Sequence, residues 1–352
     1  MSSESRQVLV TGAGGWLGRR LVDTLVHGLP DTPSLRQPSG DLRVRALVLD
    51  PADAPAIEAL SDRVEVVVGD LRNPDVCERL CRGAEGGVLY HAAGVIHPRR
   101  VADFYAVNVQ GTKNVLAAAS RAGVRRAVVV SSNSPFGGNP SREHRFDEQS
   151  DYHPYMNYGR SKMRMELLVR DVQRSGSIST VIIRAPWFYG PYQPPRQTLF
   201  FTMIRDGKMP LVGDGGNLRS MAYVDNLCQG MQLAAGAPAA DGKAYWIADR
   251  APYAMRDIID TVERLLETEF QRPCVHKRMA LPNLASDVAR MIDGLLQSVG
   301  IYQQKIHVLS EMNMTIACTV AKAERELGYQ PAIALEEGMR RSIRWCIEQG
   351  HL

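Results

Sequence analysis

A tyrosine and a lysine four residues apart, Tyr158 and Lys162, have the spacing that most clearly suggests chemistry. The residues that follow, 163–168, predict a helix, and residues four apart lie on the same face of a helix. A free tyrosine has a pKa of about 10, but a fixed cation a few ångströms away favours its phenolate. Such a tyrosine could exchange the proton of an alcohol while hydride leaves the carbon. An aromatic–cation pair on a solvated helix has the same spacing, so the rest of the chain must decide between these interpretations.

A glycine-rich turn follows the first apolar segment of the chain. Residues 8–11 predict a strand and residues 19–26 a helix, with G-x-x-G-x-x-G between them. Glycines permit a tight turn and close approach of the backbone to a pyrophosphate, and a helix N-terminus offers free N–H groups. We therefore expect a dinucleotide to bind at Gly12, Gly15, Trp16, Leu17 and Gly18.

Acidic residues end the next two predicted strands. Asp50 follows the strand at 44–49, where a carboxylate would bind the adenosine ribose and so favour NAD over NADP. It lies 32 residues after Gly18 rather than about 20, and the excess at 28–43 predicts a surface insertion. An alternative is that Asp50 only starts the turn before Pro51. Asp70, followed by Leu71, ends the strand at 64–68 and could meet the adenine amino group.

Two further strand ends would complete the same edge of the sheet. The predicted strand at 87–94 closes on His91, Ala92, Ala93 and a glycine, and these small side chains would leave room for the flat face of a cofactor. The strand at 127–130 is followed by Ser131 and Ser132. A helix over 104–120 separates them. Apolar strands alternating with helices indicate a parallel sheet covered on both faces, with ligands at its carboxyl edge. The loop after Ser132 could return Tyr158 to that edge.

Taken together, these motifs resemble the extended short-chain dehydrogenase/reductase family, which includes NAD-dependent epimerases/dehydratases and 3β-hydroxysteroid dehydrogenase-type enzymes. They run in the family's order from about residue 8 to 240 and continue at 323–331. The residues that carry the resemblance are Thr11-Gly12-x-x-Gly15-x-x-Gly18, Asp70-Leu71, His91-x-Ala93, Asn108-Val-x-Gly111-Thr112, Ser131-Ser132, Tyr158-x-x-x-Lys162, Arg184-Ala-Pro186-x-x-Tyr189-Gly190-Pro191, Gly213-Asp214-Gly215, Tyr223-Val224-Asp225 and Ala323-x-x-Glu326-Leu327-Gly328-Tyr329-x-Pro331.

The resemblance implies a role for each catalytic residue. Ser132 would hydrogen-bond the reacting oxygen, Tyr158 would act as general base or acid, and Lys162 would bind the nicotinamide ribose and lower the pKa of Tyr158. Asn108 would support Lys162 from the neighbouring helix. Ala185 and Pro186 would close the backbone over the nicotinamide.

The resemblance also bears on the reaction and the class of substrate. Dehydratases of this family place an Asp-Glu pair after the catalytic hydroxyl, where this chain has Asn133 and Ser134. Trp187 stands where enzymes acting on nucleotide sugars usually have asparagine, and it suits a flat or hydrophobic substrate as well as a sugar. Arg219 stands where the family's arginine grips a nucleotide diphosphate, and Arg196 adds a cation nearby. A domain-bridging ion pair is the alternative for Arg219.

These observations predict an α/β fold, a Rossmann-type doubly wound parallel sheet with a smaller, mostly α C-terminal substrate domain. The NAD-binding domain would span 1–186, with 220–250 returning to it. The substrate domain would take 187–219 and 251–352, with helices at 258–266, 284–299 and 335–346. The resemblance further implies a homodimer through the helices around 108–119 and 158–170.

Composition narrows the class of protein. The 352 residues carry 42 basic and 38 acidic side chains without long runs of one sign, so neither nucleic acid nor membrane is an expected partner. Six cysteines without CxxC spacing predict reduced thiols and a cytoplasmic protein, and the eight histidines form no metal-binding pattern.

The leading expectation is an NAD-dependent nucleotide-sugar 4-epimerase or dehydrogenase. A hydroxysteroid-dehydrogenase-like oxidoreductase of a hydrophobic hydroxy or keto substrate is the alternative. A non-catalytic NAD-binding redox sensor is a third, against which the intact Ser132, Tyr158 and Lys162 count. Substrate identity, reaction direction, retention of NAD between turnovers and the role of 301–319 are left open by the sequence.

Overall fold

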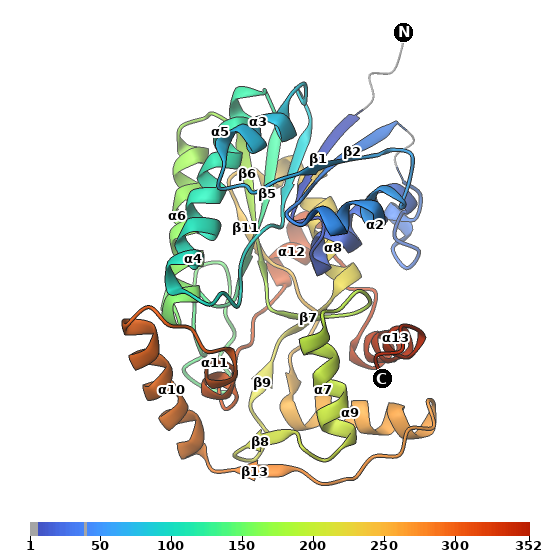
Figure 1. The fold of residues 1–352 in the computed structure, drawn as a ribbon, viewed down its shortest axis with the longest axis vertical. Helices are drawn as coiled ribbons and strands as arrows, with labels where there is room; N and C mark the ends of the chain where they lie inside the picture. The colour runs from blue at the N-terminus through green and yellow to red at the C-terminus, as the bar shows by residue number, and fades with distance from the viewer. Residues whose placement is uncertain (1–5, 39–40) are drawn as a thin grey trace.

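A computed structural model describes residues 6–38 and 41–352, and its centre is a seven-stranded parallel sheet (Figure 1). Every neighbouring pair of its strands is parallel, and the inner strands are buried because helices cover both faces. The predicted Rossmann-type fold is therefore confirmed. The strands, in spatial order, are β11 (Ala244–Trp246), β6 (Ser179–Ala185), β5 (Arg126–Ser132), β4 (Val88–His91), β1 (Arg6–Thr11), β2 (Leu42–Val48) and β3 (Val64–Val68).

Helices pack on the two faces of this sheet as two separate apolar cores. One core takes its helical side chains from α1 (Trp16–His27), α8 (Val224–Gly236) and α12 (Ala321–Leu327). The other takes them from α3 (Pro74–Cys81), α5 (Thr112–Arg121) and α6 (Met156–Arg174). Short elements occupy the connections: η1 (Pro33–Leu35), η2 (Pro51–Asp53), α2 (Ala54–Glu58) and η4 (Pro238–Ala240). Of the predicted insertion at 28–43, residues 39 and 40 lie outside the described residues.

The helix predicted at 104–120 is interrupted by a wider turn. It consists of α4 (Val101–Tyr105), the π-helix η3 (Ala106–Gly111) and α5. At Gly111 a Cβ atom would lie 1.6 Å from Leu71 Cδ1, so any other residue here would force the Leu71 side chain to move. The π turn carries Asn108 into the protein interior, where that side chain is fully buried. Single π turns within helices are frequent at functional sites.

A second lobe lies below the sheet in Figure 1 and has its own apolar core. Its helices α7 (Pro195–Arg205), α9 (Met255–Thr268) and α13 (Leu335–Glu348) surround this core. The hairpin of α10 (Asn283–Ser298) and α11 (Gln304–Glu311) lies to one side. The predicted C-terminal helices correspond to α9, α10 and α13. Three strand pairs complete the lobe: β7 (Trp187–Tyr189) with β10 (Met221–Tyr223), β8 (Pro210–Val212) with β13 (Met279–Leu281), and β9 (Leu218–Arg219) with β12 (Tyr253–Ala254).

The segment from Cys318 to Tyr329 returns to the first lobe. Cys318, Val320 and Tyr329 are buried in the core of the sheet, and the Tyr329 hydroxyl donates to the carbonyl of Ala248 at 2.7 Å. The predicted assignment of all of 251–352 to the substrate domain therefore does not describe this segment, because its apolar side chains pack on the sheet. Within the described residues, no helix is both long and apolar enough to cross a bilayer.

Candidate active site

The glycine turn between β1 and α1 is fixed by close backbone contacts. Gly12 has φ of 73°, and a Cβ atom there would lie 2.7 Å from the backbone nitrogen of Ala93. At Gly18 a Cβ atom would lie 2.0 Å from the Gly12 carbonyl oxygen. Helix α1 begins after Gly15 without a side-chain cap, which leaves backbone N–H groups for a ligand. Leu17 is buried, and the Trp16 indole donates to the Pro191 carbonyl at 2.6 Å.

The two predicted nucleotide-binding acids lie at the carboxyl ends of neighbouring strands. Asp50 follows β2 and accepts the backbone N–H of Ala52 at 3.0 Å, so it caps η2 as the turn interpretation predicts. Asp70 follows β3 and is bonded to Arg72, which lowers the pKa of its carboxyl group. Asp50 is exposed and follows β2, the neighbour of β1, and its ribose role stays a prediction.

Both ring nitrogens of the His91 side chain are bonded within the protein. Its Nδ1 lies 2.7 Å from the Thr11 hydroxyl and its Nε2 lies 2.8 Å from the Thr112 hydroxyl. Burial lowers the pKa of His91 to about 3, so the imidazole is neutral. The His91 side chain is therefore not free to bind a cofactor, whereas Ala92 and Ala93 after it are partly exposed. The Ala93 N–H donates to the Thr11 hydroxyl at 3.2 Å.

Ser132 and Tyr158 meet at the carboxyl end of β5. Burial raises the pKa of Tyr158 to about 12, and a hydrogen bond with the Ser132 hydroxyl opposes that rise. Ser132 also accepts the backbone N–H of Ser134 at 3.2 Å, and its hydroxyl lies 3.4 Å from Asn133 Oδ1. The turn after β5 therefore holds the serine hydroxyl toward the phenol at the N-terminal end of α6.

Lys162 differs from its predicted arrangement. Its ammonium donates to the Val130 carbonyl at 3.0 Å, and burial lowers its pKa to about 8 while Glu166 opposes that change. The Ser132 hydroxyl and the charge of Arg196 lower the pKa of Tyr158, and the effect of Lys162 on that pKa stays a prediction. The sequence could not show that a main-chain carbonyl lies closer to the ammonium than the phenol does.

Asn108 supports helix α6 through a different residue than expected. Its amide donates to the Ser161 hydroxyl at 3.1 Å and accepts the backbone N–H of Val95 at 2.8 Å. A Cβ atom at Gly94 would lie 3.2 Å from Asn108 Oδ1 and 3.3 Å from Lys162 Nζ. Asn108 therefore positions the residue before Lys162, and the two side chains border the same glycine.

The pKa of Lys162 predicts how stability depends on pH in the absence of NAD. Between about pH 8 and its ordinary value of 10.5, the unfolded chain binds more protons than the folded protein. The free energy of unfolding therefore gains up to about 1.4 kcal/mol per pH unit from this group as pH rises, and the gain is lost as pH falls to 8. Urea titrations of the wild type and Lys162→Met should show this pH-dependent difference. The exposed Lys113→Met is the control, and a flat Lys162 difference would contradict the assignment.

The buried end of β6 supports the other side of α6. Arg184 and Glu166 form an ion pair at 2.9 Å with side chains only 1% and 0% exposed. Ala185 and Pro186 follow Arg184 and are buried. The Ser131 hydroxyl, on the neighbouring strand, is buried without a hydrogen-bond partner among the described residues.

The residues expected to face the substrate are only partly free to do so. The Trp187 indole donates to Gln197 at 3.1 Å and its ring packs edge-on against Phe200 at 5.3 Å, so its single donor is already used. Arg219 donates to the Glu311 carbonyl, and burial lowers the pKa of its guanidinium. Arg196, at the start of α7, lies close enough to Tyr158 for its charge to lower the pKa of the phenol.

Four residues near Tyr158 were not predicted. The Phe104 ring lies 5.7 Å from Tyr158 and 5.3 Å from Tyr302, and the Tyr302 hydroxyl lies 2.7 Å from His97 Nδ1. The charge of Glu311 raises the pKa of Tyr158. Tyr302 and Glu311 belong to the segment 301–319, which contains no recognisable motif. Long-range contacts place that segment: isolated bridges pair Ile301 with Arg100 and Ile316 with Arg219, and Ser310 is bonded to Tyr155. The sequence carries no signal for these contacts.

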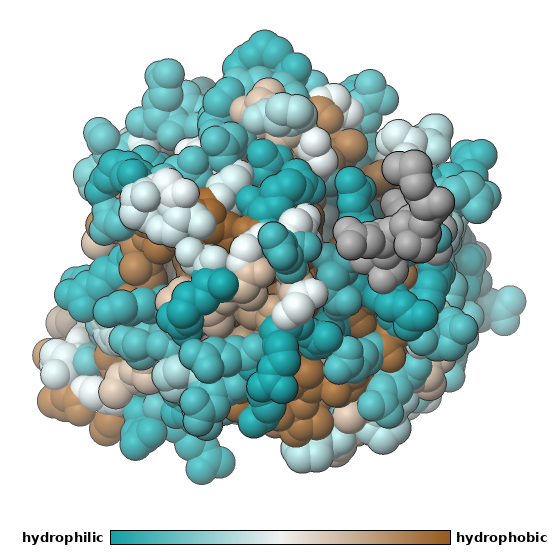
Figure 2. Space-filling model, turned by 90° about the horizontal axis from the view of Figure 1, so that it is seen from above, coloured by the Kyte–Doolittle hydropathy of each residue, from teal (hydrophilic) through white to brown (hydrophobic). Residues whose placement is uncertain are grey.

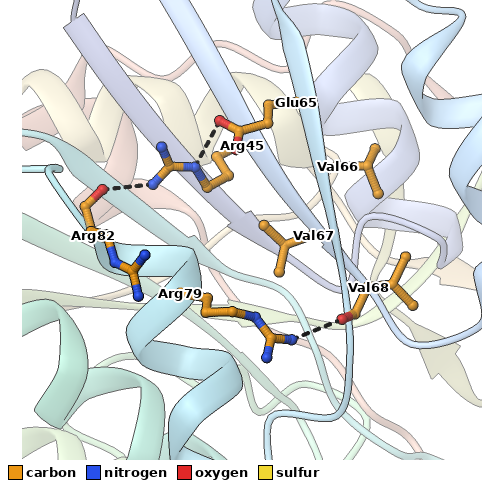
Figure 3. A pocket seen from close by; sticks show the side chains of 7 residues that line it. All are labelled: Arg45, Glu65, Val66, Val67, Val68, Arg79 and Arg82. Atoms are coloured by element: carbon orange, nitrogen blue, oxygen red, sulfur yellow. Dashed lines mark hydrogen bonds and ion pairs between the residues drawn. The ribbon is translucent and has the colours of Figure 1, made fainter.

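Two surface pockets lie apart from these residues, and neither contains Ser132, Tyr158 or Lys162. The one in Figure 3 lies between β3 and α3, where Arg45 binds Glu65 at 2.9 Å and Arg79 donates to the Val68 carbonyl at 3.3 Å. The other lies between α1 and α13. Its lining arginines Arg20 and Arg341 are bonded to Asp225 and Asp31. Among the residues described, no group of three or more His, Cys, Asp or Glu side chains could hold a metal ion.

The site fits a dinucleotide cofactor. The backbone cradle at Gly12 and Gly18 would be filled by any Cβ atom, the N-terminus of α1 is uncapped, and Ser131 presents an unpaired hydroxyl at the same strand edge. These features bind a pyrophosphate and offer a donor to a polar ring.

Comparison with known proteins agrees with this geometry. The model of the NAD dependent epimerase/dehydratase family matches residues 8–248, and the chain belongs to that family. It is 51% identical to the uncharacterized protein y4nL of Sinorhizobium fredii over 97% of this chain and 96% of that one. It is 30% identical to 3beta-hydroxysteroid-dehydrogenase/decarboxylase isoform 1 of Arabidopsis thaliana, over 97% and 80% respectively.

A solved structure extends the comparison to the cofactor. The dTDP-glucose 4,6-dehydratase DesIV of Streptomyces venezuelae, with NAD and TYD bound, is 28% identical, with a TM-score of 0.73 and 97% of each chain covered. The predicted relationship to the extended short-chain dehydrogenases/reductases and the predicted use of NAD are thus confirmed. The family also supports an oxidoreductase or epimerase as the class of enzyme.

Proposed function

We propose that this protein is an NAD-dependent 4-epimerase or dehydrogenase of a nucleotide sugar. The observation that carries the proposal is Arg219, whose guanidinium is held by the main-chain carbonyl of Glu311. No carboxylate hydrogen-bonds to it within residues 6–38 and 41–352. A partly buried arginine with donors to spare is suited to a diphosphate.

In the proposed mechanism, the substrate hydroxyl lies against Ser132 and Tyr158. Ser132 donates to the reacting oxygen, and Tyr158 takes the hydroxyl proton on its phenol oxygen or returns it. Bound NAD supplies the hydride acceptor. Lys162 binds its ribose, and the fixed positions of the side chains bring the carbon and the acceptor together. The glycine turn, Asp50, Asp70 and Leu71 hold the adenosine half.

The residues after Ser132 support redox chemistry or epimerisation over elimination of water. Elimination needs one group to remove a proton and another to protonate the departing hydroxyl. Asn133 and Ser134 provide neither acid, and the Ser134 hydroxyl is buried against Ser132 at 3.3 Å.

A second candidate is a dehydrogenase of a hydrophobic hydroxy or keto compound. The aromatic contacts of Tyr158 with Phe104, and of Phe104 with Tyr302, favour it, as does Trp187 in the wall of the second lobe. Under this alternative Arg219 would not touch the substrate. A non-catalytic redox sensor would have no use for Ser132, Tyr158 and Lys162 together. The homodimer remains a prediction.

Replacing Arg219 with alanine separates the two candidates. With a UDP- or dTDP-hexose, loss of charged hydrogen bonds to phosphate is expected to raise KM by about 10–100-fold with little change in kcat. Epimer formation and NADH absorbance, followed together over a panel of such sugars, identify the reaction. Arg250→Ala is the matched control, since Arg250 is largely exposed and pairs with Glu324. If the protein turned over a steroid or long-chain hydroxy compound at the same rate with and without Arg219→Ala, the second candidate would be established instead.

A further inference from the structure

Most exposed large apolar side chains of this protein gather in one short region. Of the fourteen that are exposed in the described residues, ten lie between positions 275 and 308. Six of them follow one another at helical spacing, five on α10 and the sixth at its C-cap, and form one face, which we call the α10 face. The α10 face consists of Leu284, Val288, Met291, Ile292, Leu295 and Val299, which are 42–70% exposed.

The opposite side of α10 is firmly packed. Ser286 donates to the Leu309 carbonyl of α11 at 2.9 Å, and Asp293 is buried against His307 at 2.7 Å. Gln297 accepts both the backbone N–H and the side-chain amide of Asn157 on α6 at 3.0 Å. The helix is therefore held in place with its apolar face outward. It lies at the end of the molecule opposite the N-terminus in Figure 1, and the other end, seen in Figure 2, is predominantly hydrophilic.

The chain around the α10 face is basic. Residues 272–308 contain five Lys and Arg and two Asp, a net charge of +3 within a chain of net charge +4. Asp293 is buried in its pair with His307, and Asp287 pairs with Arg290. Arg278 is bonded to Asp260 and Glu263, which leaves Arg272, Lys277 and Lys305 as the cations without an ion pair within the described residues. Lys277 and Lys305 are exposed, and within the described residues neither has an ion pair.

We propose that the α10 face lies on an anionic lipid bilayer. A packed amphipathic helix with an apolar face and neighbouring cations is the usual form of a helix that binds in the interfacial plane of a membrane. A second copy of the chain fits the face less well. Two copies joined through this face would bring the exposed Lys277 and Lys305 of each copy toward those of the other, and like charges disfavour such a contact.

The proposal differs from the expectation drawn from overall charge, because a balanced total hides the local excess around 272–308. The proposal also places the active site near the membrane surface. Helix α10 is bonded to α6, which carries Tyr158, and the α10–α11 hairpin carries Tyr302 and Glu311 beside that phenol. The catalytic residues would then face a substrate close to the bilayer. This last point rests on the proposed function, whereas lipid binding does not.

Vesicle flotation tests the proposal without substrate or NAD. The full-length protein is expected to float with vesicles of equal parts phosphatidylglycerol and phosphatidylcholine, and at least tenfold less with phosphatidylcholine alone or in high salt. Met291→Gln combined with Leu295→Gln should reduce flotation at least tenfold, because both side chains are more than 60% exposed and their loss leaves the core intact. Leu199→Gln, at a residue 53% exposed on α7, is the matched control and should float like the wild type.

Circular dichroism and light scattering complete the test. All variants should keep the wild-type spectrum and the wild-type mass. Absence of flotation by the wild type, or equal flotation by the double variant, would overturn the proposal. A double variant that becomes monomeric while the wild type is dimeric would overturn it in favour of a second copy. Because no sugar enters this experiment, a negative sugar panel would leave its outcome unchanged.

Discussion

Replacing Tyr158 with phenylalanine is expected to lower kcat by about 10²–10⁴-fold, the usual contribution of a positioned general acid or base. The substitution removes one oxygen and keeps the ring that packs on Phe104. Folding, NAD binding and KM should therefore change little. Steady-state rates with the substrate found in the sugar panel, together with an NAD titration, measure the effect.

Tyr155→Phe is the matched control for that experiment. Tyr155 lies three residues earlier, and its hydroxyl is bonded to Ser310 at 2.6 Å. Loss of that bond should leave kcat within a few-fold of the wild type. If Tyr158→Phe retained full activity, or if both variants lost activity equally, proton transfer by Tyr158 would be excluded as the mechanism.

Glu166→Gln is expected to cause the largest loss of stability, about 3–5 kcal/mol, because it leaves the Arg184 charge buried without its partner. Arg184 lies over the Phe136 ring at 4.3 Å, and its Nη1 has no hydrogen-bond partner among the described residues even in the wild type. Urea denaturation followed by circular dichroism measures the change. The same substitution removes the Glu166 charge, which raises the pKa of Lys162, so the ammonium should titrate at a lower pH.

An exposed ion pair gives the control for this second experiment. Glu78 pairs with Arg121 at 3.0 Å with both side chains more than half exposed, and Glu78→Gln should cost less than about 1 kcal/mol. Equal losses in the two variants would mean that burial does not decide the strength of the Arg184 pair. A stable Glu166→Gln protein with unchanged activity would contradict the positioning role of the pair.

The parallel sheet was predictable because its signals are local. The apolar strand β1 is followed by glycine and β5 ends in serine, and the helices between the strands repeat apolar residues at helical spacing. No local pattern predicts the π-helix at 106–111, and the close contact of its Gly111 with Leu71 joins residues far apart in the sequence. The return of Cys318–Tyr329 to the first lobe also depends on contacts between residues far apart in the sequence.

Some features of the candidate site were likewise predictable from local spacing and others were not. The spacing of Tyr158 and Lys162 predicted that both lie on one helix, and the order of the strands predicted that Ser132 lies at the same edge of the sheet. Spacing could not show that Lys162 would reach the Val130 carbonyl, or that Asn108 would bond to Ser161. Tyr302 and Glu311 approach Tyr158 through tertiary packing of the α10–α11 hairpin, and no pattern in the sequence encodes that approach.

The route of the chain between the lobes has a consequence for folding during synthesis. Strand β11 follows the first part of the second lobe, and the core of the sheet also needs Val320 and Tyr329. Domains fold as units while the ribosome adds about 5–20 residues per second. The nucleotide-binding lobe of this protein therefore cannot complete its core until nearly the whole chain has emerged. A nascent chain stopped before residue 318 would expose apolar sheet surface to chaperones, although every glycine and catalytic residue of the site had already been made.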